Sequence, residues 1–419
     1  MTMVRDAVPL RERIDTDMKE LAEIVDGSQP GWTRTALSEA DTAGRRWALR
    51  RMRAAGLEAH IDPAGNVIGR LPGRDPAAGA ILTGSHTDTV AGGGRFDGNV
   101  GFVGALEAVR ALREADRRLD HDLVVVNFFS EEPNDFGLSC VGSRALTGQL
   151  TQEHLALTDD RGNRYADALT VGGIDPAEMT RARLDAATVR AFLELHIEQG
   201  PVLEEQGAQI GLVSTITGLA RFRALFHGRR DHAGTMPMAS RQDAGCAAAG
   251  TVLAVERIAS AHEHGRGTIG SVTFTPEAVN IVSDRAEVFG ELRSPEREWL
   301  EYAQKALLGA AGDEASRRGV TLDFSWLPSK EPADMSPALL DVCTDVVAGL
   351  GYSHSRMYSG AEHDAAIMAQ FCPTAMIFVP SHDGRSHCPE EWTDSDDILA
   401  GVHALTESIT RVDSAAFDR

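Results

Sequence analysis

Residues that commonly bind metal ions lie at or soon after the ends of four short apolar runs in this 419-residue chain: His86, Asp97, Glu131, Glu132, His196 and His387. Three imidazoles, Asp97 and one glutamate can hold two divalent ions if the Asp97 carboxylate bridges them. Glu131 then lies beside the ions with none to bind, and it can act as a base. Two ions with a shared water and a free carboxylate form a hydrolytic site.

The four apolar runs, AILTGSH, LVVVNFF, FLELH and AMIFVPS, are rich in Val, Ile, Leu and Phe and have the length of strands. Such runs are typical of buried parallel strands. In open α/β sheets, ligands bind beyond the carboxyl ends of the strands. A single histidine after a strand is more often an ordinary polar residue. The same placement at four strand ends is what favours a metal site at one edge of a sheet.

The composition argues against several classes of function. Hydrophobic content of 42% and charged content of 25% are those of a soluble globular protein. No apolar run reaches the roughly 18 residues of a membrane span, and the first twenty residues lack the apolar segment of a signal peptide. The five cysteines form no CxxC pair, so we expect a reduced, cytoplasmic protein without disulfides. A net charge of −21 argues against nucleic acid or anionic membrane as a partner.

The order of predicted elements indicates one domain inserted into another. Residues 1–211 alternate strands with helices, including a helix at 98–115 directly after Asp97, and the α/β pattern resumes at 330–419. Residues 212–329 predict a β-α-β-β-α-β order, the ferredoxin-like arrangement. Its predicted elements are a strand at 220–228, a helix at 241–262, strands at 268–276 and 286–294, a helix at 295–319 and a strand at 321–328. We therefore expect a discontinuous first domain that contains His387 and a continuous second one.

Motifs between about Gly84 and Thr393 carry a family resemblance. In order they are GSHTDTV, GGRFDG, the Glu131–Glu132 pair, HIEQGPVLE, DHAGTMPM, RQDA, NIVSD, ELR, SGAEHDA and FVPSHDGRSHCPEEWT. The chain resembles the amidohydrolase branch of the M20 metallopeptidase family, which includes N-carbamoyl-L-amino-acid hydrolases, β-ureidopropionases and allantoate amidohydrolases. HIEQGPVLE and the tract from SGAEHDA to EEWT separate this branch from the peptidases and deacetylases of the family.

The resemblance implies a fold and a ligand set. The expected fold is α/β: a zinc-peptidase-like catalytic domain with a mixed, mostly parallel sheet, plus an inserted ferredoxin-like α+β domain for dimerisation that also acts as a lid. Two divalent ions per subunit are implied, Zn²⁺ or else Mn²⁺, Co²⁺ or Ni²⁺, with His86 and His196 on one, Glu132 and His387 on the other, and Asp97 between them. We expect Asp88 to hydrogen-bond the His86 imidazole and set its tautomer.

The resemblance also implies roles in catalysis and substrate binding. Glu131 is the expected general base. His232, in DHAGT, is expected to reach an active site across the dimer interface and polarise the scissile carbonyl. Asn280 and Arg293 are expected to hold a substrate carboxylate, for which the planar guanidinium is well shaped. The remaining predicted substrate contacts are Gln199, Gly360, Ala361 and His363.

The expected reaction is hydrolysis of an N-carbamoyl-L-amino acid to the free amino acid, ammonia and carbon dioxide. The alternatives are a ureide such as allantoate or ureidoglycolate, an N-acyl amino acid, or a catalytically silent binding protein on the same fold. The tract EEPNDFG departs from the Gly-rich or Arg-containing sequence expected after the glutamate pair. Asn134, Asp135 and Phe136 are therefore candidates for lining the substrate pocket, and the preferred substrate stays open.

Overall fold

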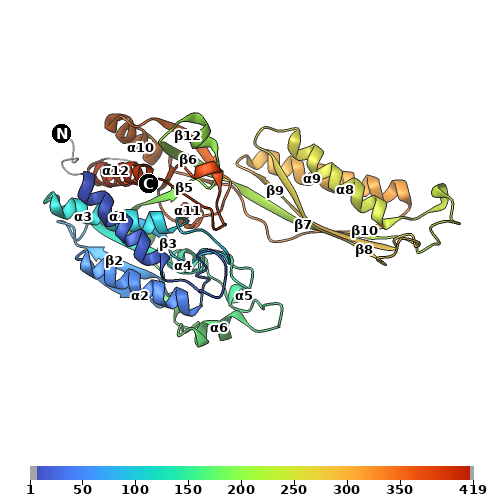
Figure 1. The fold of residues 1–419 in the computed structure, drawn as a ribbon, viewed down its shortest axis with the longest axis horizontal. Helices are drawn as coiled ribbons and strands as arrows, with labels where there is room; N and C mark the ends of the chain where they lie inside the picture. The colour runs from blue at the N-terminus through green and yellow to red at the C-terminus, as the bar shows by residue number, and fades with distance from the viewer. Residues whose placement is uncertain (1–6, 416–419) are drawn as a thin grey trace. The chain divides into compact units, whose positions relative to one another are not determined.

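The computed structural model describes residues 7–415, which divide into two compact units (Figure 1). Unit 1 comprises the residues up to 214, together with 334–357 and those from 361 on. Unit 2 comprises 215–333 and 358–360. The predicted insertion was 212–329. Its limits differ because strand β6 (Ile210–Ile216) continues the sheet of unit 1, and because a short return segment, 358–360, joins unit 2.

A nine-stranded mixed sheet forms the centre of unit 1 within the described residues. Its four middle strands run parallel, in the order β4 (Asp122–Phe128), β3 (Ala80–His86), β5 (Val189–Ile197) and β13 (Thr374–Val379). Every residue of β13 and most of β3 and β5 are buried, because helices cover the sheet, so these strands have continuous apolar sequences. The remaining strands of the sheet are β1 (Glu58–Ile61), β2 (Val67–Leu71), β6, β11 (Ala333–Asp334) and β12 (His354–Ser359). The predicted α/β class and the four predicted strands are confirmed.

Helix α3 (Asn99–Glu114) begins two residues after Asp97, as predicted, and packs against β3, β5 and α12 (Ser395–Ser414). Twelve of its sixteen residues are buried, and this long buried contact holds the Asp97 end of the helix against the sheet. The other helices of unit 1 are α1 (Ala7–Ala22), α2 (Glu39–Ala54), α4 (Val141–Thr147), α5 (Gln152–Leu155), α6 (Tyr165–Val171), α7 (Val202–Gln206), α10 (Pro337–Leu350) and α11 (Asp364–Met368), with short 3₁₀ turns η1 (Met179–Ala182), η2 (Ala186–Thr188) and η4 (His382–Gly384).

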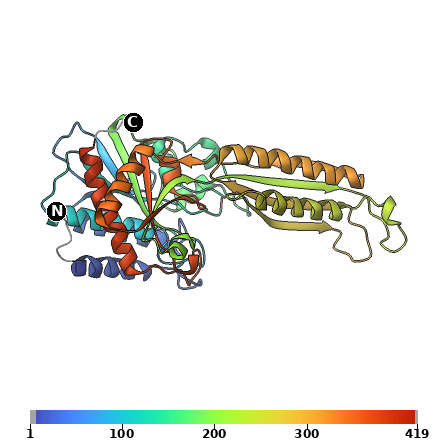
Figure 2. The ribbon, with the colours of Figure 1, turned by 90° about the horizontal axis from the view of Figure 1, so that it is seen from above.

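Unit 2 has the predicted β-α-β-β-α-β order, with an added 3₁₀ turn, η3 (Met238–Ser240). Its strands β7 (Gly218–His227), β8 (Arg266–Thr275), β9 (Arg285–Ser294) and β10 (Thr321–Trp326) form an antiparallel sheet in the order β10-β7-β9-β8. Helices α8 (Ala244–Ser260) and α9 (Arg297–Arg318) run side by side along this sheet (Figure 2). The core between sheet and helices includes Phe222, Phe226, Val288 and Leu307. Strand β8 lies at an edge of the sheet.

None of the helices in the described part of the chain has the length and apolar character that crossing a membrane requires.

Candidate metal centre and substrate-binding residues

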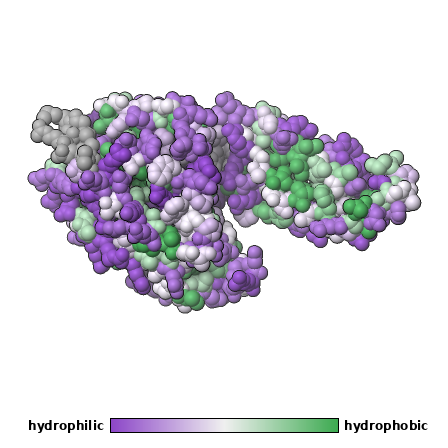
Figure 3. Space-filling view, in the orientation of Figure 1, coloured by the Kyte–Doolittle hydropathy of each residue, from purple (hydrophilic) through white to green (hydrophobic). Residues whose placement is uncertain are grey.

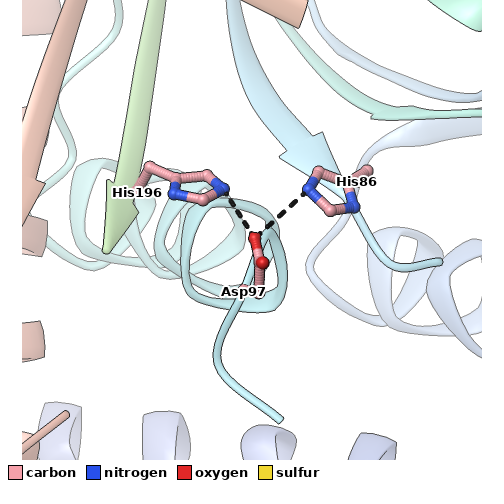
Figure 4. A group of neighbouring side chains, drawn as sticks. All are labelled: His86, Asp97 and His196. Carbon is pink, nitrogen blue, oxygen red and sulfur yellow. Dashed lines mark ion pairs between the residues drawn. The ribbon is translucent and has the colours of Figure 1, made fainter. Parts of the chain in front are cut away.

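Asp97 lies at the centre of a cluster of side chains beyond the carboxyl ends of β3, β4, β5 and β13. Its Oδ1 is 3.7 Å from His86 Nε2 and 3.1 Å from His196 Nε2 (Figure 4). Its Oδ2 is 3.0 Å from His387 Nε2, which is itself 3.3 Å from Glu132 Oε1. The structure thus brings together all five predicted ligands, and the two oxygens of Asp97 face different pairs of them.

The spacing of these atoms suits two ions. Ligands about 2.0–2.2 Å from a tetrahedral ion lie about 3.4 Å from one another. Within each set, His86–Asp97–His196 and Asp97–Glu132–His387, the ligand atoms all lie within 4.8 Å of one another. Imidazole and carboxylate donors without thiolate suit Zn²⁺, Mn²⁺, Co²⁺ and Ni²⁺ alike.

The hydrogen bonds of the histidines aim their Nε2 atoms at Asp97. His86 Nδ1 donates to the main-chain carbonyl of Asp88, and His196 Nδ1 donates to that of Ile197, both at 2.9 Å. A carbonyl oxygen can only accept, so each Nδ1 carries the proton. The Gly98 N–H donates to His196 Nε2 over 3.1 Å, so this nitrogen presents a lone pair. Nitrogen lone pairs and carboxylate oxygens that face one another are the donor set of a cation.

Asp88 links the two ends of this cluster. Its carbonyl makes the hydrogen bond to the His86 imidazole that the sequence predicted. Its carboxylate accepts the main-chain N–H groups of Glu131 (3.3 Å) and Glu132 (3.1 Å). Asp88 therefore positions the glutamate pair as well as the imidazole.

The buried carboxylates of the cluster favour added positive charge. Burial raises the pKa of Glu131 well above its usual value and also raises that of Glu132. Burial alone would raise the pKa of Asp97 too, but the imidazoles of His196 and His387 beside it hold it well below its usual range. Hydrogen bonds to Asp97 and Glu132 raise the pKa of His387 to about 10. Divalent ions would supply this positive charge without protonating the imidazoles.

Unusual backbone conformations surround the cluster. Ser130, Cys140, Gln199 and His387 have φ between 52° and 59°, in the left-handed region that non-glycine residues rarely adopt. Each such residue costs of order 1–3 kcal/mol and persists only where neighbouring structure enforces it. Gln199 and His387 are predicted site residues, and Ser130 directly precedes Glu131. Their concentration at one edge of the sheet is typical of an active site.

Two predicted substrate contacts lie against the ligands themselves. The Gln199 side-chain nitrogen is 2.8 Å from Asp97 Oδ2 and 3.5 Å from His387 Nε2, while its buried Oε1 has no hydrogen-bond partner among the described residues. The His363 ring centre is 4.4 Å from that of His196, and the side chain is buried. Burial lowers the pKa of His363 well below its usual value, so its imidazole is neutral. His363 therefore packs against a ligand, whereas Gln199 hydrogen-bonds to one.

His232 and Asn280 lie together in unit 2, on the loops beyond the His227 end of β7. His232 Nδ1 accepts the N–H groups of Gly234 (3.0 Å) and Thr235 (3.2 Å), so the proton of the neutral ring is on Nε2. The main-chain carbonyl of Asn280 accepts the Ala233 N–H at 3.0 Å. The exposed His232 side chain thus presents a fixed N–H donor.

Arg293 lies at the other end of the same sheet. Pairing of β7 with β9 places Arg285 beside His227 and Ser294 beside Gly218. The eight residue steps from 285 to 293 span about 27 Å at about 3.4 Å each. Arg293 donates through Nε to Glu291 (2.6 Å) and through Nη1 to the carbonyl of Gly360 (3.0 Å), whereas Ala361 belongs to unit 1. Within one copy of unit 2, Asn280 and Arg293 therefore cannot hold the same small carboxylate.

Three polar residues near the cluster were not predicted: the buried Glu194 and Glu391 and the partly buried Ser386. Glu194 accepts hydrogen bonds from Ser85 Oγ (2.7 Å) and from the Ala365 N–H (3.1 Å). Ser386 and Glu391 contact the Asp97 segment. An acidic residue inside the apolar run FLELH was the available signal for Glu194. Glu391 belongs to the quoted motif PEEW, but nothing in that motif indicates its partners.

Comparisons with known proteins agree with this geometry. Residues 82–411 match the family described as Peptidase family M20/M25/M40. An N-carbamoyl-L-amino-acid amidohydrolase of Paenarthrobacter aurescens is 38% identical over 96% of this chain and 98% of its own length. A ureidoglycolate hydrolase of Oryza sativa subsp. japonica is 34% identical over 97% of this chain and 85% of its own. The crystal structure of an amidase of the hydantoinase/carbamoylase family from Burkholderia multivorans has a TM-score of 0.88 and 32% identity, covering 97% of this chain and 98% of that one.

Proposed function

Since this chain belongs to peptidase family M20/M25/M40, we propose that it is a metal-dependent amidohydrolase that cleaves the carbamoyl C–N bond of N-carbamoyl-L-amino acids. The predicted family resemblance is confirmed, and so is the class of enzyme, a hydrolase that acts on C–N bonds. The products would be the amino acid, ammonia and carbon dioxide. The observation that carries the proposal is the pair of ligand sets around Asp97 with Glu131 beside them.

Each oxygen of Asp97 would serve one ion. His86 and His196 would complete the set at Oδ1, and Glu132 and His387 the set at Oδ2. Bound divalent ions would lower the pKa of an attacking water and polarise the scissile carbonyl. The hydrogen bonds on Nδ1 of His86 and His196 keep the ligating nitrogens aimed at this place.

Glu131 would move the proton. It is buried, its Oε2 lies 3.5 Å from His86 Nε2, and it belongs to neither ligand set. As general base it would take a proton from the attacking water and then return it to the departing nitrogen. Both tasks need a carboxyl group beside the ligands, and the hydrogen bond from the Glu131 main-chain N–H to Asp88 fixes the backbone from which this side chain extends.

We also propose that the active form is a homodimer in which His232 and Asn280 serve the site of the other copy. The separation of Asn280 and Arg293 along one sheet supports this, because two copies can place both groups on one substrate. Unit 2 offers surfaces for such contact. Strand β8 is an edge with unpaired main-chain groups, and apolar residues gather on the helical side of the unit (Figure 3), where Leu253 of α8 and Leu308 of α9 are exposed. A two-fold axis would make each contact twice.

The test is ammonia release from a panel of substrates: N-carbamoyl-L-amino acids of several side chains, ureidoglycolate, allantoate and N-acetyl amino acids. Each is assayed with demetallated protein and after adding Zn²⁺, Mn²⁺, Co²⁺ or Ni²⁺. We expect activity only with a metal ion and fastest turnover on an N-carbamoyl amino acid. Faster turnover of a ureide would replace the substrate assignment, in line with the ureidoglycolate hydrolase similarity. Full activity in metal-free protein would overturn the proposal.

A further inference from the structure

A buried glutamate outside the predicted ligand set joins the two loops that carry Asp97 and His387. Glu391 is only 2% exposed. Its Oε1 accepts hydrogen bonds from the main-chain N–H groups of Phe96 (2.7 Å) and Asp97 (3.0 Å). Its Oε2 accepts one from Ser386 Oγ at 2.7 Å, and Ser386 directly precedes His387. One carboxylate therefore holds the main chain of a bridging ligand and the residue next to another ligand.

The residues around Glu391 provide space and a positive charge for its carboxylate. A Cβ on Gly94 would lie 2.1 Å from the Glu391 carboxylate, so only glycine leaves room for it. The Arg95 guanidinium stacks over the Trp392 ring, 4.6 Å from its centre, and its charge attracts Glu391. Segments 94–97 and 386–392 are thus joined by the hydrogen bonds of the Glu391 carboxylate. The cation–π contact of Arg95 with Trp392 joins the same two segments, and Gly94 leaves the space that the carboxylate occupies.

The contacts of Glu391 concern mainly one half of the metal cluster, because they reach the His387 segment and the shared ligand Asp97. Ser386 Oγ is 3.3 Å from Asp97 Oδ2, the oxygen that faces His387 at 3.0 Å. Among the described hydrogen bonds, none joins Glu391 or Ser386 to His86 or His196. Replacing Glu391 would therefore disturb the geometry of the Oδ2 ligand set more than that of the Oδ1 set.

We propose that Glu391 is a positioning residue for the ligand set of Asp97 Oδ2, Glu132 and His387. The inference rests on the proposed metal site and adds to it a residue that binds no ion. Ligand atoms must lie within about 0.2 Å of their ideal distance from an ion. Loss of a hydrogen-bond partner of a ligand typically costs about 10–100-fold in metal affinity or activity. Glu391 contacts the segments of two ligands of this set, Asp97 and His387, but of the other set it contacts only the shared ligand Asp97. Its loss should therefore have an effect of this size on the ion of this set and a smaller effect on the other ion.

The test is Glu391→Gln in the full-length protein, titrated with Zn²⁺ against a competing chelator. Glutamine keeps nearly the same shape and an oxygen for the two N–H groups, but its amide donates toward Ser386 where the carboxylate accepted. We expect one Zn²⁺ to bind about 10–100-fold more weakly and the other to be weakened clearly less, because the two share only Asp97. The kcat should fall while KM stays close to wild type. Glu107→Gln is the control, because Glu107 is fully buried on α3 and bonded to Arg13 and Arg110. It should lose stability and keep both affinities.

Equal weakening of both ions, or wild-type binding of both, would overturn the positioning role of Glu391. If Glu391→Gln does not fold, Ser386→Ala removes the link from Glu391 to the His387 segment together with the Ser386 contact to Asp97 Oδ2. It should weaken the same ion, and unchanged affinity would overturn the inference. Wild-type protein that binds no Zn²⁺ would instead overturn the metal site itself, so the two failures are distinguishable.

Discussion

Replacing Gly98 with alanine should prevent His86 from binding a metal ion, although no ligand residue is itself replaced. Gly98 has φ +65° and stands between Asp97 and the first residue of α3. A Cβ at this position would lie 2.3 Å from His86 Nε2, about 1.1 Å closer than the 3.4 Å at which ordinary contact begins. The new methyl group would therefore occupy the space in front of the ligating nitrogen.

Two costs follow, and they can be separated. A left-handed alanine costs roughly 1–2 kcal/mol of stability, and Gly98, with φ 65° and ψ −40°, lies outside that region in a conformation that costs alanine at least as much. The contact with His86 adds a displacement of about 1 Å, several times the tolerance of about 0.2 Å for a metal ligand. We expect Zn²⁺ affinity to fall by at least the roughly 10–100-fold that a lost partner of a ligand costs. Gly207→Ala is the control for a positive φ, although its ψ of 30° differs from the −40° of Gly98. Its φ is +63°, and no atom of the described chain lies within 4 Å of the added Cβ position.

The assays are chemical denaturation of the metal-free proteins and Zn²⁺ titration against a chelator. Both variants should lose backbone stability, Gly98→Ala the more, and only Gly98→Ala should lose Zn²⁺ affinity and hydrolytic activity. Wild-type Zn²⁺ affinity in Gly98→Ala would show that His86 Nε2 does not face an ion where the structure places it. An equal loss of affinity in Gly207→Ala would show that backbone strain, not contact with His86, is the cause.

Three further predictions concern the proposed roles. Glu131→Gln should keep both ions and lose roughly 10²–10⁴-fold in kcat, whereas Glu132→Gln should lose bound metal. Metal content and steady-state kinetics measure the two effects, and the reverse pattern would exchange the roles of the two glutamates. Mixing His232→Ala and Glu131→Gln chains should restore about a quarter of wild-type activity, because half of randomly paired dimers contain one intact site of two; activity no higher than that of the separate variants would contradict a shared site. Arg293→Ala should weaken use of an N-carbamoyl amino acid by about 10–100-fold, Arg293→Lys should recover part of that loss, and neither should change hydrolysis of the carboxamide analogue; equal effects on both substrates would exclude a carboxylate anchor.

The local elements were predictable because each is encoded by neighbouring residues. Strand β3 spans the same residues as the predicted run AILTGSH, and α8 and α9 lie within their predicted ranges. Continuous apolar sequence marks strands buried on both faces, and a change to helical spacing marks the inserted unit. The limits of that unit were less predictable. Strand β6 has an apolar sequence like the others, and only its pairing with β13 assigns it to the sheet of unit 1.

The sequence by itself determined the type of chemistry at the candidate site. Imidazoles and carboxylates after four buried strands must meet where the strands end, so His86, His196 and the glutamate pair could be brought together without coordinates. Sequence could not show which atoms face each other. The Nε2 atoms are aimed by carbonyl groups of Asp88 and Ile197, and those contacts depend on the conformation of each loop.

Only the tertiary structure decided the longer connections. Glu391 lies 295 and 294 positions from the two N–H groups that it binds, and no periodic pattern links residues so far apart. Likewise, the register of β7 with β9 is what sets Asn280 and Arg293 at opposite ends of one sheet. The physical reason is that periodicity reports which face of an element is buried, whereas hydrogen bonds between distant segments depend on how the packed elements align.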